Sequence, residues 1–551
     1  MASNRDWEYE FKLKQYSSKY LHGVYENGAD AGGRIEYVWM FIIIGILILI
    51  MPSINFMNLS TAHSLKRAKE VGIRKTLGSN KSSLIRQFLT ESGLISFMSL
   101  LAAIVIAIIA LPFFNELAGT EIKIPFLNSI FWLVILSSAI VLSLFSGWYP
   151  AFFMSQFIPV KVLKGLGKSS VGGGNVRNSL VVFQFTISVF LIVATIVVFK
   201  QLDFIQGKDL GFSKDQVLIV NDVYGARDKA DVFKQEVLKL PQVEHASLSS
   251  FLPTPSSRSD TSFYREGYTE QENAINMQKW RVDYDYLATL DIKLIAGRDF
   301  SQQRATDSTA IIVNETAVSI LGVQPEEALG MRLSDDLGDE SGTFFTVIGV
   351  VENFHFSSLK NDIGALSLRV ARSTGNMAIK LKAGDFSNSV AEIEQVWKRM
   401  VPEQPFAYSF MEDSFNNTYK SEQRLGHIFI IFTILSIFIA CLGLFGLAAF
   451  NAEKRTKEIG VRKVLGASVS QISYRLTIDF LKLVGIAILI SLPIGWFAMN
   501  KWLEDFSYRI EISWWVLALA GFLAIAIAII TVSYQSIKAA IVNPVKSLRT
   551  E

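Results

Sequence analysis

The chain has 551 residues, of which 50% are hydrophobic and only 19% are charged, and its mean hydropathy is +0.33. A soluble protein usually carries about 25% charged residues, so this composition indicates a membrane protein. The net charge of +3 does not favour a nucleic-acid partner, and five scattered histidines with one cysteine, Cys441, exclude an intrachain disulfide and predict neither a metal site nor a cofactor.

Seven apolar stretches are long enough to cross a bilayer as helices, which needs roughly 20 mostly apolar residues. They are Val38–Leu59, Gly93–Phe114, Ile130–Phe153, Leu180–Phe199, Ile428–Phe450, Phe480–Met499 and Trp514–Val532. The sixth stretch contains Lys482 and Pro493. Both are tolerated, because a lysine near the end of a span can reach the interface and neighbouring helices can compensate for a proline.

The strongest pattern in the chain is a basic segment that occurs twice, as Arg67–Gly78 and as Arg455–Gly466. Each copy lies between two apolar stretches. A glutamate precedes an arginine by four residues in each copy, a spacing that stabilises a helix by a few tenths of a kcal/mol. Each copy ends in a glycine, where the residue after a helix commonly takes a left-handed conformation. We therefore predict a short basic helix, a glycine break and a helix that leads into a span.

Helix-opening signals follow both glycines. Ser468–Gln471 has the capping-box pattern, and in the first copy Ser79 or Asn80 can cap. On a helical wheel the first copy shows no clean apolar stripe, because Ile73 and Leu77 share a face with the glutamate. The alternative role is a juxtamembrane helix held by anionic lipid. Attraction to lipid needs positive charge, but it does not need the same Glu, Gly and Leu-Gly in two places.

The distribution of Lys and Arg predicts the orientation in the membrane. Both duplicated segments are rich in these residues, whereas the loop at 115–128 holds only Lys123 and the loop at 500–513 holds only Lys501 and Arg509. We expect the duplicated segments and the C-terminus to be cytoplasmic and Met1 to be exterior. A fainter repeat after the last span of each half, Ile158–Lys164 and Asn543–Arg549, is also expected inside.

The two halves are unequal in length. The second copy is preceded by a span and a long exterior segment, but only 66 residues precede Arg67. By the symmetry of the repeat, roughly 210 residues are expected to be missing, and residues 1–36 would be the tail of a lost exterior domain. We also expect spans one to three to match spans five to seven about a pseudo-two-fold axis along the membrane normal.

Residues 200–424 form a polar insert between the fourth and fifth spans. Gln216–Val223 and Phe344–Val351 are predicted strands, and Ala230–Leu240 and Val390–Met400 are predicted amphipathic helices. The insert is therefore expected to be an α+β exterior domain, with a turn-rich loop at 247–257.

Two candidate enzymatic features fail on inspection. Gly165–Ser169 resembles the end of a phosphate-binding loop, but Val162 stands where that motif requires a glycine. His355 lies between two phenylalanines, which favours a core or domain-edge residue over a catalytic base. The chain is therefore predicted not to be an enzyme.

Three polar residues, Asn55, Asn58 and Gln184, lie within or at the ends of spans. Interhelical hydrogen bonds of about 0.6 kcal/mol each are the favoured interpretation. Contact with a transported substrate is the alternative, although no intramembrane charge marks a pathway.

Several of these motifs resemble one known family. Asn55–Ser60, Arg67–Gly78 and Gln87–Ser92 are similar to bacterial ABC-transporter permeases of the MacB/FtsX type, in particular to the long two-half permeases of Bacteroidota. Val350–Leu359 is similar to a stretch of the periplasmic domain in that subgroup. The resemblance covers nearly the whole chain, except for the expected missing first span and first periplasmic domain.

The resemblance implies mechanotransmission. A separate cytoplasmic ABC ATPase, present as a dimer, would close on ATP, pull on the cytoplasmic helices and move periplasmic domains. Membrane lipid and a periplasmic adaptor would be further partners, and the location would be the bacterial inner membrane. The residues expected to couple to the ATPase are Arg67, Glu70, Gly72, Arg74, Lys75, Gly78, Arg455, Glu458, Gly460, Arg462, Lys463 and Gly466.

The expected fold is an α-helical membrane protein with an α+β periplasmic domain and seven spans in two homologous halves. The expected division is a periplasmic-domain tail at 1–36, an FtsX-like permease domain at 37–165, a linker and fourth span at 166–200, a MacB-like periplasmic domain at 201–424 and a second FtsX-like permease domain at 425–551. Export or efflux is the favoured function. The alternatives are control of periplasmic cell-wall hydrolases and release of lipoproteins.

Overall fold

The computed structural model describes residues 15–16, 20–26, 29–66, 68–155, 173–254, 256, 258, 260–268, 274–335 and 343–541. The chain splits into two compact units. The membrane unit comprises Met1–Val197, Gly426–Met499 and Ile512–Glu551, and the α+β domain comprises Val198–Leu425 and Asn500–Glu511.

Seven helices in the described residues are long and apolar enough to cross a membrane, as the sequence predicts. They are α2 (Ile35–Lys66), α4 (Lys81–Ala118), α5 (Ser129–Ser155), α7 (Gly173–Gly207), α14 (Lys420–Lys454), α16 (Val469–Leu503) and α17 (Trp514–Ile541). Two short helices, α3 (Ala68–Thr76) and α15 (Thr456–Val464), follow α2 and α14, and a two-stranded hairpin, β1 (Val24–Glu26) and β2 (Ala29–Gly32), precedes α2. Each half therefore has one long helix, one short helix and two long helices.

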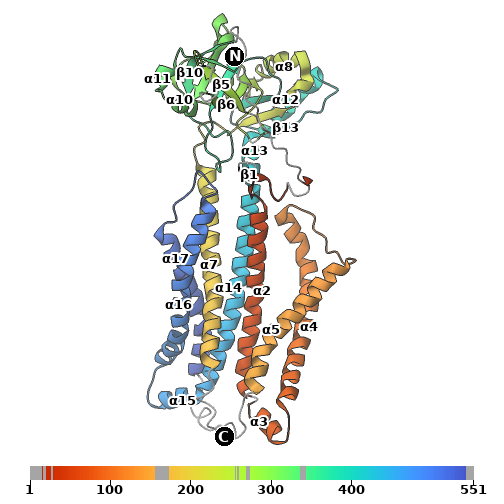
Figure 1. Cartoon of the computed structure of the whole chain (residues 1–551), viewed down its shortest axis with the longest axis vertical. Helices are drawn as coiled ribbons and strands as arrows, with labels where there is room; N and C mark the ends of the chain where they lie inside the picture. Colours follow the sequence, from red (N-terminus) through yellow and green to blue (C-terminus); the bar gives the residue numbers. More distant parts are fainter. Residues whose placement is uncertain are drawn as a thin grey trace, which may run out of the picture. The chain divides into compact units, whose positions relative to one another are not determined.

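The helices of the membrane unit differ in burial. In the most apolar stretch of α7, 67% of the residues are buried, whereas none are buried in that of α4. α7 is tied to α14 by hydroxyl pairs, Ser188 with Ser436 at 2.7 Å and Thr195 with Thr433 at 2.8 Å. α7 therefore forms the core of this unit, and α4 lies at its edge against α5 (Figure 1).

The contact between α2 and α14 supports the predicted pseudo-two-fold relation. Asn55 and Gly443 are equivalent positions of the two repeats, and a Cβ on Gly443 would lie 2.9 Å from Asn55 Oδ1. Farther along, Gly446 approaches Leu59 in the same way. The helices thus run in the same direction and meet at corresponding positions, as an axis parallel to them requires. Both short helices lie at one end of the unit, so the halves are not inverted (Figure 1).

The predicted interhelical hydrogen bond is present for Gln184, one of the three polar residues in the spans. Gln184 Nε2 donates to the carbonyl of Ile439, 3.4 Å away on α14. Asn55 Oδ1 and Asn58 Nδ2, in contrast, are buried with no hydrogen-bond partner among the described residues. These two atoms therefore do not supply the predicted interhelical hydrogen bonds, whereas the other polar atom of each amide is not among the unpartnered groups. Around Gly443 of α14, the nearest polar side-chain atoms are Asn55 Oδ1 and Gln184 Oε1, and two amide oxygens cannot hydrogen-bond to each other.

The α+β domain is built on an eleven-stranded mixed sheet with the order β11-β8-β10-β9-β5-β6-β4-β12-β3-β13, in which β7 pairs with β10 and β11 also pairs with β6. The strands are β3 (Val217–Asn221), β4 (Val243–Ser249), β5 (Asp260–Arg265), β6 (Ile275–Val282), β7 (Leu294–Gly297), β8 (Ala310–Asn314), β9 (Arg332–Ser334), β10 (Phe345–Val351), β11 (Leu366–Val370), β12 (Asn376–Leu381) and β13 (Tyr408–Phe410). The helical elements are η2 (Val223–Lys229), α8 (Ala230–Val237), α9 (Tyr286–Leu290), η4 (Ala305–Thr309), α10 (Glu315–Leu321), α11 (Pro325–Ala328), α12 (Phe386–Met400) and α13 (Met411–Thr418).

The four elements predicted in this domain are all present, with changed ends. β3 stops at Asn221 because Asp222 adopts a left-handed conformation, with φ of 56°. α8 ends three residues early, at Val237. α12 begins earlier than predicted, because the side chain of Asp385 accepts hydrogen bonds from the N–H groups of Ser387 and Asn388.

The segment Asn500–Glu511, which we call the clasp segment, connects α16 to α17 and packs into the core of the α+β domain. Phe506 is 1% exposed and joins the same apolar cluster as Leu359 and Phe415. The N–H of Tyr508 donates to the carbonyl of Leu359 at 3.2 Å. Gln201 fixes the segment from both sides, donating to the carbonyl of Tyr508 and accepting from the N–H of Ile510, each at 2.9 Å.

His355 confirms its predicted place in the core. It is 7% exposed, and its ring meets that of Tyr508 edge to face, with centroids 4.5 Å apart. Burial lowers the pKa of His355 to about 4, with a further lowering from Lys208 and an opposing effect of Asp209. The imidazole is therefore neutral at physiological pH and serves the clasp segment as an aromatic packing surface.

Candidate functional site

The two copies of the duplicated segment fold in the same way, as short helices closed by the same cap. After α3, the N–H of Ser79 donates to the carbonyl of Arg74 at 3.0 Å, and that of Gly78 to the carbonyl of Lys75 at 3.2 Å. After α15, Ala467 donates to Arg462 at 3.0 Å and Gly466 to Lys463 at 3.1 Å. This is the Schellman pattern. The glycines have φ values of 95° and 92°, which confirms the predicted left-handed break.

The predicted i,i+4 ion pairs are present in both copies. Glu70 lies 2.6 Å from Arg74, and Glu458 lies 2.6 Å from Arg462. The four side chains are between 38% and 47% exposed, so each pair adds only a few tenths of a kcal/mol to its helix. The pairs thus hold four charged groups in a fixed arrangement at the surface while contributing little to stability.

One face of each short helix is anchored in an apolar cluster. Val71 of α3 packs with Leu84, Phe88 and Ala151, which come from α4 and α5. In the second half, Ile459 of α15 packs with residues of α16 and α17, namely Ile472, Leu476 and Ala540. Each short helix is therefore fastened to both of the long helices that follow it in the chain, and displacement of the short helix would be passed to them.

The opposite face carries exposed apolar side chains at matching positions. Ile73 and Leu77 are 50% and 83% exposed, and their counterparts Val461 and Leu465 are 48% and 81% exposed. The sequence wheel grouped Ile73 and Leu77 with Glu70 but gave no indication that this face is the open one. Exposed apolar side chains beside ordered charges, at matching positions of both helices, make this face a candidate surface for a partner or for the lipid interface.

Lysine and arginine side chains connect α15 to both neighbouring helices. Lys463 Nζ donates to the carbonyls of Ala540 and Ile541 at 2.9 and 3.1 Å, which places a cation at the C-terminal end of α17. Arg455 lies 3.1 Å from Asp479 of α16. Asp479 was missed in the sequence, although the equivalent position of the first half is also acidic, Glu91. Extending the repeat comparison into the following helix could have found it.

The first copy differs in its polar contacts. Arg74 Nη1 donates to Gln87 Oε1 at 3.1 Å, whereas the position equivalent to Gln87 in the second half is Arg475. Partial burial and the neighbouring Lys81 lower the pKa of Lys75. Among the expected coupling residues, Arg67 lies outside the described residues, as do the fainter repeats Ile158–Lys164 and Asn543–Arg549 and the loop Gly165–Ser169.

The helix-opening caps also differ between the copies. At the start of α16, Gln471 N–H donates to Ser468 Oγ at 3.3 Å and Ser468 N–H donates to Gln471 Oε1 at 3.1 Å, so the predicted capping box is present. At the start of α4, Asn80 occupies the capping position, but its side chain makes no capping hydrogen bond. In the described part of the chain, no group of three or more His, Cys, Asp or Glu residues could hold a metal ion.

Comparison with known proteins finds the same domain in each half of the chain. Residues 41–157 and 430–544 match the family model of the FtsX-like permease C-terminal domain, once in each half. The macrolide export ATP-binding/permease protein MacB of Haemophilus ducreyi is 32% identical over 120 residues, covering 22% of this chain and 17% of that protein. MacB of Escherichia coli is 24% identical over 319 residues, covering 55% of this chain and 47% of that protein. The chain thus spans less than half the length of these relatives.

Two solved structures resemble the chain in part. The periplasmic region of MacB from Actinobacillus actinomycetemcomitans covers 38% of this chain and 94% of its own, with 12% identity and a TM-score of 0.27. A domain of a putative permease protein from Porphyromonas gingivalis covers 36% and 89%, with 19% identity and a TM-score of 0.27.

The duplicated domain match defines an FtsX-like permease with two permease domains in one chain. The protein is a multi-pass membrane protein with an FtsX-like permease domain in each half, and it is similar to ABC-transporter permeases of the MacB/FtsX type.

Proposed function

We propose that this permease is the membrane subunit of an ATP-driven export system in which a separate cytoplasmic ATPase pulls on α3 and α15. The observation that carries the proposal is the two-faced construction of both helices. One face is anchored through Val71 or Ile459, and the other offers Leu77 or Leu465 beside an ordered Glu–Arg pair. Attraction to lipid needs positive charge, but it does not need the same Glu–Arg pair at matching positions of both helices.

The second half contains a continuous route from the coupling helix to the α+β domain. Ser468 opens α16, which runs unbroken for 35 residues from Val469 to Leu503, about 50 Å at 1.5 Å per residue. Its last residues belong to the clasp segment, whose aromatic side chains are packed into the domain core. In this proposal α16 carries force applied at α15 toward the α+β domain, which we place in the periplasm of an inner-membrane system.

The relatives named for macrolide export favour export of a hydrophobic compound over control of cell-wall hydrolases or release of lipoproteins. A periplasmic adaptor is a further partner consistent with export. We expect a strain that lacks the gene to be more sensitive to macrolide-like compounds. Expression of the wild-type permease should restore resistance. If a variant that no longer binds the ATPase also restores resistance, the coupling model is contradicted.

The direct test reverses the ordered charges. We expect Glu70→Lys and Glu458→Lys to abolish co-purification with the cognate ATPase and stimulated ATP hydrolysis, at normal membrane levels. Loss of the ion pair changes helix stability by only a few tenths of a kcal/mol, so folding should survive. Glu116→Lys, at the exposed far end of α4, is the matched control and should change neither readout. If lipid alone holds the helices, the added positive charge will preserve or improve function.

A further inference from the structure

The loop between β10 and β11, residues 352–365, contains most of the motif Val350–Leu359. Transmission of force along α16 gives this motif no role. The two strands that the loop connects belong to a closed ring of six, in the order β11-β8-β10-β9-β5-β6, which β6 completes by pairing with β11. A displacement of the β10–β11 loop therefore acts directly on two strands of this ring.

The β10–β11 loop is fixed to the start of α14. Lys360 Nζ lies 2.6 Å from Oε1 of Glu422, whose side chain is only 5% exposed. The other oxygen of this carboxylate accepts a hydrogen bond from the hydroxyl of Ser421 at 2.9 Å. One residue before the lysine, the N–H of Leu359 donates to the hydroxyl of Tyr419 at 2.8 Å. A buried ion pair and a hydrogen bond thus hold the loop to this helix.

The same lysine also contacts the clasp segment. The carbonyl of Lys360 accepts hydrogen bonds from the N–H and the hydroxyl of Ser507, at 3.2 and 3.1 Å. Its ammonium group lies 5.1 Å from the centroid of the Phe506 ring, within the range of a cation–π interaction. Lys360 therefore connects the start of α14, through its side chain, to the segment that follows α16.

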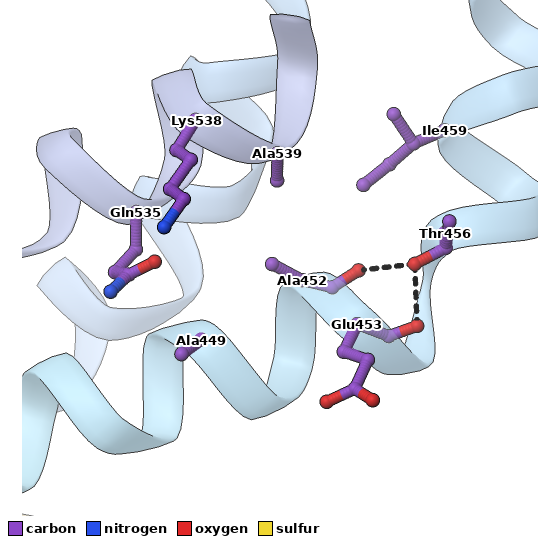
Figure 2. Close-up of a pocket in the computed structure, with 8 residues that line it drawn as sticks. All are labelled: Ala449, Ala452, Glu453, Thr456, Ile459, Gln535, Lys538 and Ala539. Carbon is purple, nitrogen blue, oxygen red and sulfur yellow. Dashed lines mark hydrogen bonds between the residues drawn. The ribbon is translucent and has the colours of Figure 1, made fainter. Parts of the chain in front are cut away.

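These two helices flank the coupling helix α15, and each of them has 35 residues. α15 is joined closely to α14, because the hydroxyl of Thr456 donates to the carbonyls of Ala452 and Glu453, at 3.3 and 2.7 Å (Figure 2). On the other side, Ile459 of α15 packs against α16. The near ends of α14 and α16 thus meet at α15, and Lys360 ties their far ends together.

We infer that Lys360 is a positioning residue that ties the far ends of α14 and α16 to the β10–β11 loop, so that a shift between the two helices displaces this loop. An apolar contact can slide, whereas an enclosed carboxylate is costly without its cation and holds the pair in one geometry. The inference rests on the proposed function for the source of the movement, but the tie itself needs no ATPase.

The functional test removes the ion pair without leaving a buried charge, by combining Lys360→Met with Glu422→Gln. We expect this variant to bind the ATPase and keep stimulated hydrolysis, but to lose the ability to restore resistance. Lys360→Arg keeps the cation and should restore resistance. The matched control combines Lys279→Met with Asp335→Asn, which removes an ion pair of 2.5 Å from the ring of strands, and it should also restore resistance.

The structural test uses the full chain alone in nanodiscs. Spin labels at Lys420→Cys and Glu504→Cys, both exposed positions, report the distance between the far ends, after Cys441→Ala removes the single native cysteine. Pulsed electron paramagnetic resonance should give a narrow distance distribution when Lys360 is intact or replaced by arginine. The distribution should broaden when Lys360→Met and Glu422→Gln are combined.

An unchanged distribution, or full resistance in the variant without the ion pair, would overturn the inference. Reduced membrane levels of this variant relative to the matched control would show that the pair serves stability alone and would overturn it as well. Failure of the wild-type chain to bind the ATPase would instead contradict the proposed function, and the label distances would still decide whether Lys360 ties the helix ends together.

Discussion

The two halves of the protein are alike at the end that carries the short helices and different at the other end. In the first half, the loop Gly119–Asn128 between α4 and α5 leaves Phe126 47% exposed and Leu127 fully exposed, and it is closed by local hydrogen bonds between Asn115 and Ile122. In the second half, the corresponding clasp segment buries Phe506 in the core of the α+β domain. The duplicated sequence thus preserves the caps and ion pairs, which are local, whereas the far loops follow what each has to pack against.

The largest expected difference is in the loss of stability when the same substitution, phenylalanine to alanine, is made in each of these two loops. Phe506→Ala removes a ring that is 1% exposed and should destabilise the α+β domain by about 3–5 kcal/mol, the usual range for a buried phenylalanine. Phe126→Ala should cost far less, about 1 kcal/mol, because the ring is already 47% exposed. Thermal unfolding and limited proteolysis of the full chain in detergent measure both. Equal effects would mean that the clasp segment is no more embedded than the first loop.

The next effect concerns pH and the clasp segment. The pKa of His355 is about 4 in the folded domain, whereas an unfolded histidine titrates near 6.5. The unfolded chain therefore binds the extra proton between these values, and His355 removes stability as the pH falls from about 6.5 to about 4, up to about 3 kcal/mol. Above about pH 6.5 this loss is absent. We expect the protection factors for hydrogen exchange, which correct for the slower intrinsic exchange in acid, to fall on acidification at residues 502–510 but not at 119–128.

Asp299 has the opposite effect on the stability of the α+β domain over nearly the same pH range. Burial raises its pKa to about 6, so the folded domain holds this proton more tightly and gains stability as the pH falls through that value. His355→Gln should therefore reverse the pH dependence, leaving a domain that becomes more stable on acidification. Asp299→Asn should make the loss in acid steeper than in wild type. An unchanged slope in both variants would rule out this assignment.

A smaller effect tests the likeness of the two short helices. Gly78→Ala and Gly466→Ala should each cost about 1 kcal/mol, because both glycines are left-handed and an added Cβ meets no atom within 4 Å. The cost is purely conformational, so it should be the same in both halves. Gly485→Ala, in the interior of α16 and also without a neighbour within 4 Å, should instead stabilise by a few tenths. Hydrogen exchange of α3, α15 and α16 resolves the three.

The smallest effect tests the difference between the two helix starts. Ser468→Ala breaks a capping box and should cost about 1 kcal/mol at the start of α16. Asn80→Ala should cost a few tenths at most, because its side chain makes no capping hydrogen bond. Local exchange rates in the first turns of α4 and α16 provide the measurement. A larger loss at Asn80 than at Ser468 would reverse the comparison.

Much of the architecture was predictable because its causes are local. A run of about 20 apolar residues must become a spanning helix, since lipid offers no partner for an open backbone. The Glu–Arg spacing and the glycine that follows each short helix likewise determine the helix, its ion pair and its left-handed end. The ends of β3 and α12 differed from the prediction because one residue determines each of them. Asp222 ends β3 through its left-handed backbone, and Asp385 begins α12 through its capping side chain.

The features that carry the function needed the tertiary structure. The sequence named Lys463, but only packing shows that it donates to carbonyls some 77 positions away on α17. Similarly, Lys360 and Glu422 form an ion pair although a loop and a helix far along the chain carry them, and Phe506 enters a core whose other members lie far back in the chain. The sequence by itself determined the spans and the two short helices, whose periodicity and caps are local. Contacts between distant segments determine which face of each short helix is buried and which loop packs into the α+β domain. No local pattern encodes these contacts.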